Sequence, residues 1–222
     1  MGTKQPYSSV ASPKKLLVDE EVLRRGLTVR FPPKAVIFAQ GDPADKIFYL
    51  RSGMIKLYFM SREGYEKTVL YSEEGNFFGD AGMLRGKPYG ITAVTVTGCE
   101  VVVFTVGQFL TLFKENTEFA EACLYSLAEK LWATGRQVNN LAFETGYGKV
   151  VSALAYVARH SGVPGGQEPG EVRVEVTQQE LAEMAGVSRV TVSATLKDLQ
   201  KSNIISTSRN AILVQNLELL RL

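Results

Sequence analysis

The chain has little of what metal sites and catalytic dyads are built from, because its 222 residues include one histidine and two cysteines. A four-cysteine iron–sulfur cluster therefore lacks its ligands. Haem is disfavoured because the only histidine, His160, lies in the C-terminal third, where we expect it on the surface or at a helix end. A metalloenzyme on a β fold would also need histidines, and no Gly-x-Ser-x-Gly elbow or phosphate-cradling Walker loop is present. We expect no enzyme and no bound metal.

Long apolar runs and a strong net charge are also missing. No run approaches ~18 apolar residues, so we expect no membrane span, and the N-terminus lacks the apolar stretch of a secretory signal. Cys99 and Cys123 lie in apolar segments, which favours buried free thiols and a reducing cytoplasm. The net charge is +2, and residues 144–222 contain eight basic and eight acidic residues. Any nucleic-acid binding must therefore rest on the geometry of a motif.

Residues 177–199 supply such a motif, two short helices joined by a tight turn. Thr177 and Glu180 have the spacing of a capping box, Gly186 permits the turn, and Ser188 can cap the second helix. In that helix, apolar residues at i, i+4 and i+7 predict a buried stripe. The stripe consists of Val192, Leu196 and Leu199.

The opposite face of the second helix has the chemistry of a major-groove reader. Arg189 can donate two hydrogen bonds to guanine, and Val190 can pack on a thymine methyl. The predicted base-reading residues are Arg189, Val190, Ser193 and Lys197. The alternative is an ordinary helical hairpin with a solvated face. Residues 203–214 alternate around a polar tip, which predicts a β-hairpin wing, and residues 172–176 alternate as a strand that could pair with it.

The N-terminal half predicts a β domain between about Leu27 and Val106. Short apolar or alternating runs are separated by regular turn signals, as in a small antiparallel barrel or jelly roll. The expected strands are 35–39, 47–50, 54–59, 68–71, 92–97 and 101–105. Such a domain either encloses a small ligand or only packs a core.

Residues 117–143 predict a long helix with apolar residues at alternating spacings of three and four, the pattern of a helix–helix dimer seam. The predicted seam is Leu124, Leu127, Leu131, Thr134, Val138 and Leu141. We expect Phe119 and Trp132, which lie off the seam, to meet the barrel, although the whole helix could instead lie on its own barrel. Gly146 and Gly148 then form a hinge before a further helix.

This arrangement resembles the CRP/FNR superfamily of bacterial transcription regulators. The resemblance extends from about Gly26 to Val214 and is most specific over 134–143 and 177–206. It implies an α+β fold in which an antiparallel β-roll (16–116) is joined by a dimerisation helix (117–143) to a winged helix-turn-helix (144–222). It also implies a cytoplasmic homodimer that binds a two-fold-symmetric DNA site, contacts RNA polymerase, and responds to a small effector between β-roll and dimer helix.

Carried over residue by residue, Arg189 matches the arginine of this family that reads guanine. Val190 replaces an acidic residue and Ala194 replaces an arginine, so we expect an A/T-rich half-site. Ser193 falls where FNR-like members contact a base. The residues expected to contact the DNA backbone are Thr177, Gln179, Ser188, Thr191, Ser208 and Arg209.

The effector site departs further from the family. Asp80, in the segment 75–84, stands where a glutamate grips a ribose, but Gly90 and Ile91 replace the phosphate-binding arginine and serine. Burying an unpaired phosphate charge is costly, so a cyclic nucleotide is disfavoured unless another cation substitutes. The candidates for that cation are Arg85, Lys87 and Lys130. We expect instead a small organic effector, a carboxylate or an aromatic. The predicted pocket is lined by Gly79, Asp80, Tyr89, Gly90, Ile91, Lys130 and Thr134.

Several alternatives remain open at this point. Asp80 could be a surface turn residue and Tyr89 a core residue. A regulator with a collapsed pocket that needs no ligand is a further alternative. The winged helix could contact protein instead of DNA in a ligand-binding module. An enzyme on the β fold would have to bind a metal in stoichiometric amount.

Overall fold

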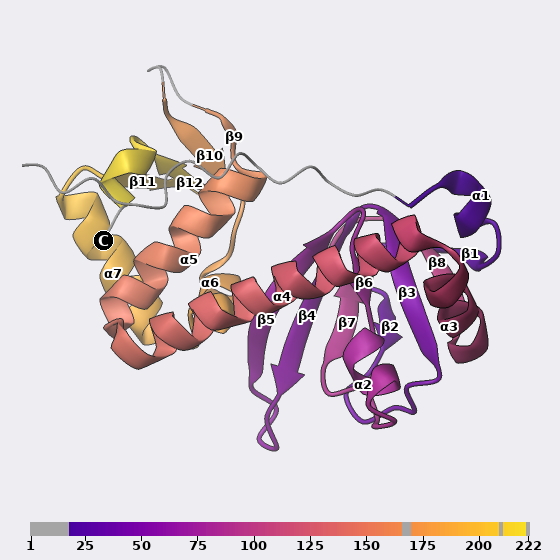
Figure 1. The fold of residues 1–222 in the computed structure, drawn as a ribbon. Coiled ribbons are helices and arrows are strands. Elements are labelled where there is room, and N and C mark those ends of the chain that lie inside the picture. Colours follow the sequence, from indigo (N-terminus) through magenta and orange to yellow (C-terminus); the bar gives the residue numbers. More distant parts are fainter. Residues whose placement is uncertain (1–17, 166–169, 209–210, 221–222) are drawn as a thin grey trace, which may run out of the picture.

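The computed structural model describes residues 18–165, 170–208 and 211–220. The chain forms a β-roll and a smaller helical part, and the long helix α4 (Thr117–Phe143) runs from one to the other (Figure 1). The N-terminal elements are α1 (Glu20–Leu23), β1 (Leu27–Phe31), β2 (Val36–Phe38), β3 (Lys46–Ser52), β4 (Met54–Met60), β5 (Glu66–Glu73), β6 (Phe77–Phe78), α2 (Asp80–Leu84), β7 (Thr92–Thr95), β8 (Cys99–Thr105) and α3 (Val106–Glu115).

The β-roll consists of two four-stranded antiparallel sheets, in the orders β1-β8-β3-β6 and β2-β7-β4-β5. Side chains that alternate along these strands fill the space between the sheets. Aromatic rings dominate one part of this core, where Phe38 stacks on Phe48 and Tyr89. The predicted β-roll is confirmed.

Helix α4 buries one face of its first half in the roll, and its second half contains no buried residue. Thr105 caps α3 with Gln108 in a capping box, and Asn116 caps α4. Phe119 is 1% exposed in the core of the roll, as predicted. The prediction for Trp132 was wrong, because its side chain is 70% exposed. Trp132 follows Phe119 by thirteen residues, which places the two side chains about 220° apart around the helix axis. Both therefore cannot face the β-roll.

The C-terminal part is a winged helix. Its elements are α5 (Gly146–Ser161), β9 (Val163–Pro164), β10 (Val172–Val174), α6 (Gln178–Ala185), α7 (Arg189–Lys201), β11 (Ile205–Ser208), β12 (Ala211–Val214) and the 3-10 helix η1 (Leu217–Leu220). Strands β11 and β12 form the predicted hairpin, and β10 adds to it antiparallel. The strand expected at 172–176 is two residues shorter, because only its first three residues pair with β12.

Candidate nucleic-acid interface and effector site

The turn between α6 and α7 has the geometry that its sequence predicts. The Thr177 hydroxyl accepts the Glu180 amide at 3.1 Å, and the Glu180 carboxylate accepts the Thr177 amide at 2.8 Å. Gly186 ends α6 in the left-handed region with φ +67°. The Ser188 hydroxyl then accepts the Thr191 amide at 3.2 Å and starts α7. These caps satisfy backbone groups that a helix leaves unpaired at its ends.

Helix α7 buries one face and leaves the other free. Its predicted stripe is confirmed, since Val192, Leu196 and Leu199 lie in the core of the winged helix. On the other face Arg189, Val190 and Lys197 are exposed and Ser193 is half-buried, with Val190 78% exposed. The start of α7 therefore presents a charged and an apolar side chain that a partner can reach.

The side chains predicted to touch the DNA backbone surround this face but already have bonds within the protein. The hydroxyls of Thr177 and Ser188 serve as caps. Gln179 donates its side-chain amide to Glu183 at 3.0 Å, and Ser208 lies in β11. Arg209 lies outside the described residues.

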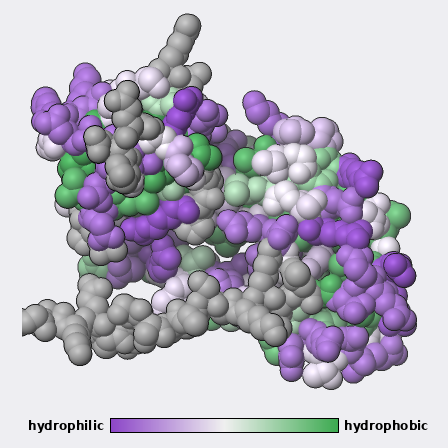
Figure 2. All heavy atoms as spheres, turned by 90° about the horizontal axis from the view of Figure 1, so that it is seen from above, coloured by the Kyte–Doolittle hydropathy of each residue, from purple (hydrophilic) through white to green (hydrophobic). Residues whose placement is uncertain are grey.

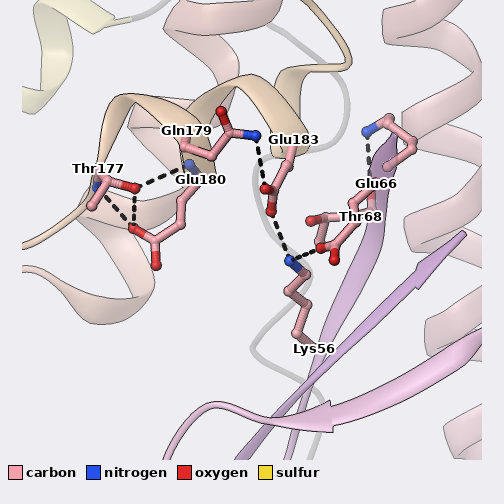
Figure 3. A network of polar contacts seen from close by, with 8 residues as sticks. Lys56, Glu66, Thr68, Thr177, Gln179, Glu180 and Glu183 are labelled. Atoms are coloured by element: carbon pink, nitrogen blue, oxygen red, sulfur yellow. Dashed lines mark hydrogen bonds and ion pairs between the residues drawn. The ribbon is translucent and has the colours of Figure 1, made fainter. Parts of the chain in front are cut away.

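A cluster of charges ties the winged helix to the β-roll, and no sequence pattern predicted it. Lys56 of β4 donates to Glu66 of β5 and to Glu183 of α6, both at 2.7 Å (Figure 3). The side chains of Lys56 and Glu183 are each 15% exposed. Burial disfavours the ammonium of Lys56, but its hydrogen bonds to Glu183 and Glu66 raise its pKa above the usual value. We name these three residues the charge clasp.

Lys67 makes a second contact between the parts. Its ammonium donates to the Met184 carbonyl at 2.6 Å, to the Gln137 side-chain oxygen at 2.9 Å and to the Thr68 carbonyl at 2.9 Å. Burial, together with the nearby charge of Lys149, lowers the pKa of Lys67 to about 8. Lysine side chains shift in this way when they are desolvated without a carboxylate partner.

A cavity of about 640 Å³ lies beside these contacts, between β5, α4 and α5. Figure 2 shows a hollow between the two parts, and hydrophilic side chains cover much of the surface around it. Tyr71 and Tyr156 stack at one side, with ring centroids 6.3 Å apart. Of the seven predicted pocket residues, only Lys130 borders this cavity.

The predicted effector residues mostly bind or pack against one another. Asp80 is 6% exposed, so it is not a surface turn residue, and its carboxylate pairs with the Lys130 ammonium at 2.5 Å. Tyr89 is a core residue whose hydroxyl donates to the Lys46 carbonyl at 2.7 Å. A Cβ added to Gly79 would lie 3.0 Å from the ring of Phe48 and 3.2 Å from that of Tyr89, so it would crowd this aromatic core.

The remaining pocket residues do not complete a phosphate site. Gly90 is exposed and Ile91 is half-buried, and neither side chain can bind a phosphate. Arg85 and Lys87 are exposed, and Lys130 is engaged by Asp80. Thr134 is exposed and donates to the Lys130 carbonyl at 2.7 Å. These residues do not fit a cyclic nucleotide.

The predicted dimer seam is largely uncovered in the single chain. Leu124, Leu131, Val138 and Leu141 are exposed along α4, with Leu131 at 75%. Thr134 is also exposed, and Leu127 is half-buried. Apolar side chains repeated along one helix face leave a contiguous surface that favours a protein partner.

Comparison with known proteins identifies the family. A model of the cyclic nucleotide-binding domain matches residues 28–116, and a model of the Crp-like helix-turn-helix domain matches residues 148–222. The "Global nitrogen regulator" of Synechocystis is 30% identical over 190 residues, which are 84% of this chain and 83% of that protein. The chain belongs to the CRP/FNR superfamily. It is a DNA-binding transcription regulator with a ligand-binding type of domain, and not an enzyme.

Other relatives agree. The "cAMP-activated global transcriptional regulator CRP" of Pasteurella multocida is 29% identical over 187 residues, covering 83% of this chain and 88% of that one. The structure of the c-di-GMP responsive regulator CLP of Xanthomonas campestris has the same fold, with a TM-score of 0.79 at 23% identity over 88% of this chain and 96% of that chain.

Two kinds of feature are absent from the part of the chain that the structure describes. None of the helices in that part of the chain is long and apolar enough to cross a membrane. Nor does it contain a group of three or more histidine, cysteine or acidic side chains placed to bind a metal ion. Both cysteines are buried free thiols, as predicted.

Proposed function

We propose that the chain acts as a homodimer that reads a two-fold-symmetric DNA site with the N-terminal end of α7. The observation that carries this proposal is the exposed face of Arg189 and Val190, held by a capped helix-turn-helix. The target is A/T-rich DNA in the cytoplasm, where the bound dimer contacts RNA polymerase. The domain limits that we propose are 16–116, 117–143 and 144–222.

The first test concerns DNA reading. Arg189→Ala should weaken binding to a site selected from random DNA by about 1–3 kcal/mol, since a bidentate contact to guanine is lost. Arg24→Ala, an exposed arginine in the β-roll, is the control. If Arg189→Ala binds its selected site as the unmodified protein does, Arg189 does not read DNA, and a winged helix used for protein contacts becomes the better description.

The second test concerns the dimer. Leu131→Asp should convert the dimer to a monomer in sedimentation, because it places a charge in the middle of the apolar seam. Leu110→Asp changes an exposed leucine of α3 in the same way and should leave the mass unchanged. A dimer that survives Leu131→Asp would assign the interface to another surface.

For the effector we propose a small organic molecule other than a cyclic nucleotide. A regulator without a ligand is the second candidate, and it is favoured by the pairing of Asp80 with Lys130 and the packing of Tyr89. Native mass spectrometry of freshly purified protein separates the two. A defined organic mass on the dimer supports an effector, and a ligand-free dimer that binds its DNA site fully supports the second candidate.

A further inference from the structure

The hydrogen bonds of the Lys67 side chain join the β-roll, the dimer helix and the helix-turn-helix. Its backbone belongs to β5, Gln137 belongs to α4, and Met184 belongs to the last turn of α6. Its methylene stem also lies against the turn that leads into α7. A Cβ added to Gly186 would lie 3.1 Å from the Cε atom of Lys67. The side chain therefore rests on the turn whose geometry aims α7.

The charge of Lys67 lies at the C-terminal end of helix α6. Helix α6 has no basic residue in its own last turn, where the carbonyl groups of a helix present partial negative charge. Lys67 supplies that cation from another part of the chain. Its acceptors are three neutral oxygens, and no carboxylate bonds to it among the described residues. An ammonium held in this way contributes orientation more than stability.

The contact with α4 fixes the helix as well as the lysine. The side chain of Gln137 accepts from Lys67 through its oxygen and donates through its nitrogen to the Val69 carbonyl at 2.8 Å. Both ends of the amide are therefore bonded to β5. The charge clasp ties the same end of α6 to β4 through Glu183.

We propose that Lys67 is a positioning residue for DNA reading, which sets the angle between the helix-turn-helix and the dimer helix. This inference rests on the proposed function, because the angle matters only where two reading helices must match two half-sites at a fixed separation. Lys67 does not touch the DNA in this proposal. Its loss should therefore disturb the pairing of half-sites and leave the reading of each half-site intact.

The test compares full sites with half-sites. The site that the unmodified protein selects from random DNA is prepared whole and as a duplex that carries one half-site. Lys67→Met should weaken binding to the full site at least tenfold and to the half-site less than twofold. Lys67→Arg keeps the charge and the hydrogen-bond donors, so its affinity for both duplexes should stay within threefold of that of the unmodified protein. Arg189→Ala should weaken both, and Lys46→Met, an exposed lysine of β3, should change neither.

A second measurement needs no DNA. The amides of Gly186 and Val187 both donate to the Ala182 carbonyl, and in Lys67→Met they should exchange with deuterium at least tenfold faster. Full-site binding equal to that of the unmodified protein, or equal losses on full site and half-site, overturns the positioning role. If the unmodified protein selects no DNA, the proposed function fails. Exchange then decides whether Lys67 holds the turn, and unchanged exchange overturns that role.

Discussion

The charge clasp offers a quantitative test of how the two parts of the protein are held together. Lys56 bonds to two carboxylates, and both Lys56 and Glu183 are only 15% exposed, so the solvent screens their attraction weakly. A hydrogen bond to a charged group contributes about 1.5–3 kcal/mol. Lys56→Met removes two such bonds and leaves Glu66 and Glu183 without their shared cation. We expect it to destabilise the junction by about 3 kcal/mol, the lower end of the sum for two such bonds.

Glu183→Gln should destabilise the junction less than Lys56→Met does, by about 1 kcal/mol, because Lys56 keeps Glu66 as a partner. In the Lys56→Met background the same change should cost nothing, since it removes one of two carboxylates that lack a cation. The double variant is then less damaged than the two single losses together, with a coupling energy of about 1 kcal/mol.

Differential scanning calorimetry of the four proteins measures this cycle. The midpoint of the first unfolding transition should fall by about 2–4 °C for each kcal/mol lost, the scale for a chain of this size. Arg30→Met, which breaks an exposed ion pair with Glu100 elsewhere on the roll, is the control and should shift the midpoint very little. The reasoning would be refuted if the stability loss of the double variant equalled the sum of the two single losses within about 0.3 kcal/mol. Lys56 and Glu183 would then not interact.

Three further predictions concern titration, reactivity and backbone strain. The pKa of Lys67 is about 8 in the folded protein and about 10.4 in the unfolded chain. Between these pH values the unfolded chain binds more protons than the folded protein does. In urea titrations, the free energy of unfolding, measured relative to that of Lys67→Met, should therefore rise from pH 8 to pH 10. Burial raises the pKa of Cys123 to about 12, and Cys99 is buried as well. Iodoacetamide at pH 7.5 should therefore alkylate both thiols at least about 100-fold more slowly in the native protein than in the unfolded protein. Rapid labelling of either thiol would contradict its burial. Gly53 has φ +97°, and an added Cβ would lie 2.5 Å from a backbone carbonyl oxygen. Gly53→Ala should therefore lower the free energy of unfolding by about 2–4 kcal/mol. Gly64 also has a positive φ but has open space around it, so Gly64→Ala should lower the free energy of unfolding by only about 1–2 kcal/mol.

The sequence predicted those parts of the fold whose signals are local. The capping box at Thr177, the turn at Gly186 and the stripe on α7 depend on residues a few positions apart, and all three were confirmed. The elements α1, α2, α3, β1, β6, β9 and η1 were missed. Most of these are four or five residues or fewer, too short to show a period, and tertiary packing determines them.

The site was harder to predict, because its contacts join distant residues. Lys56 and Glu183 are 127 positions apart, and Lys67 and Met184 are 117 apart. Lys56, Lys67 and Glu183 look like surface residues in their own segments, and Met184 takes part through its backbone carbonyl, so no pattern of spacing reveals either pair. Apart from Lys130, the residues expected around the effector pocket do not border the cavity between β5, α4 and α5, for a related reason. Whether Asp80 binds a ligand or Lys130 depends on how α4 crosses the roll, which spacing along the chain does not specify.

The exposed position of Trp132 has a practical consequence for spectroscopy. It is the only tryptophan in the chain, and it lies on α4 at the edge of the cavity between the two parts. Its fluorescence therefore comes from one place, without a background signal from either core. Emission should respond to a change in the angle between the parts. It should also be nearly silent when the cores melt, because an already hydrated indole changes its surroundings little on unfolding.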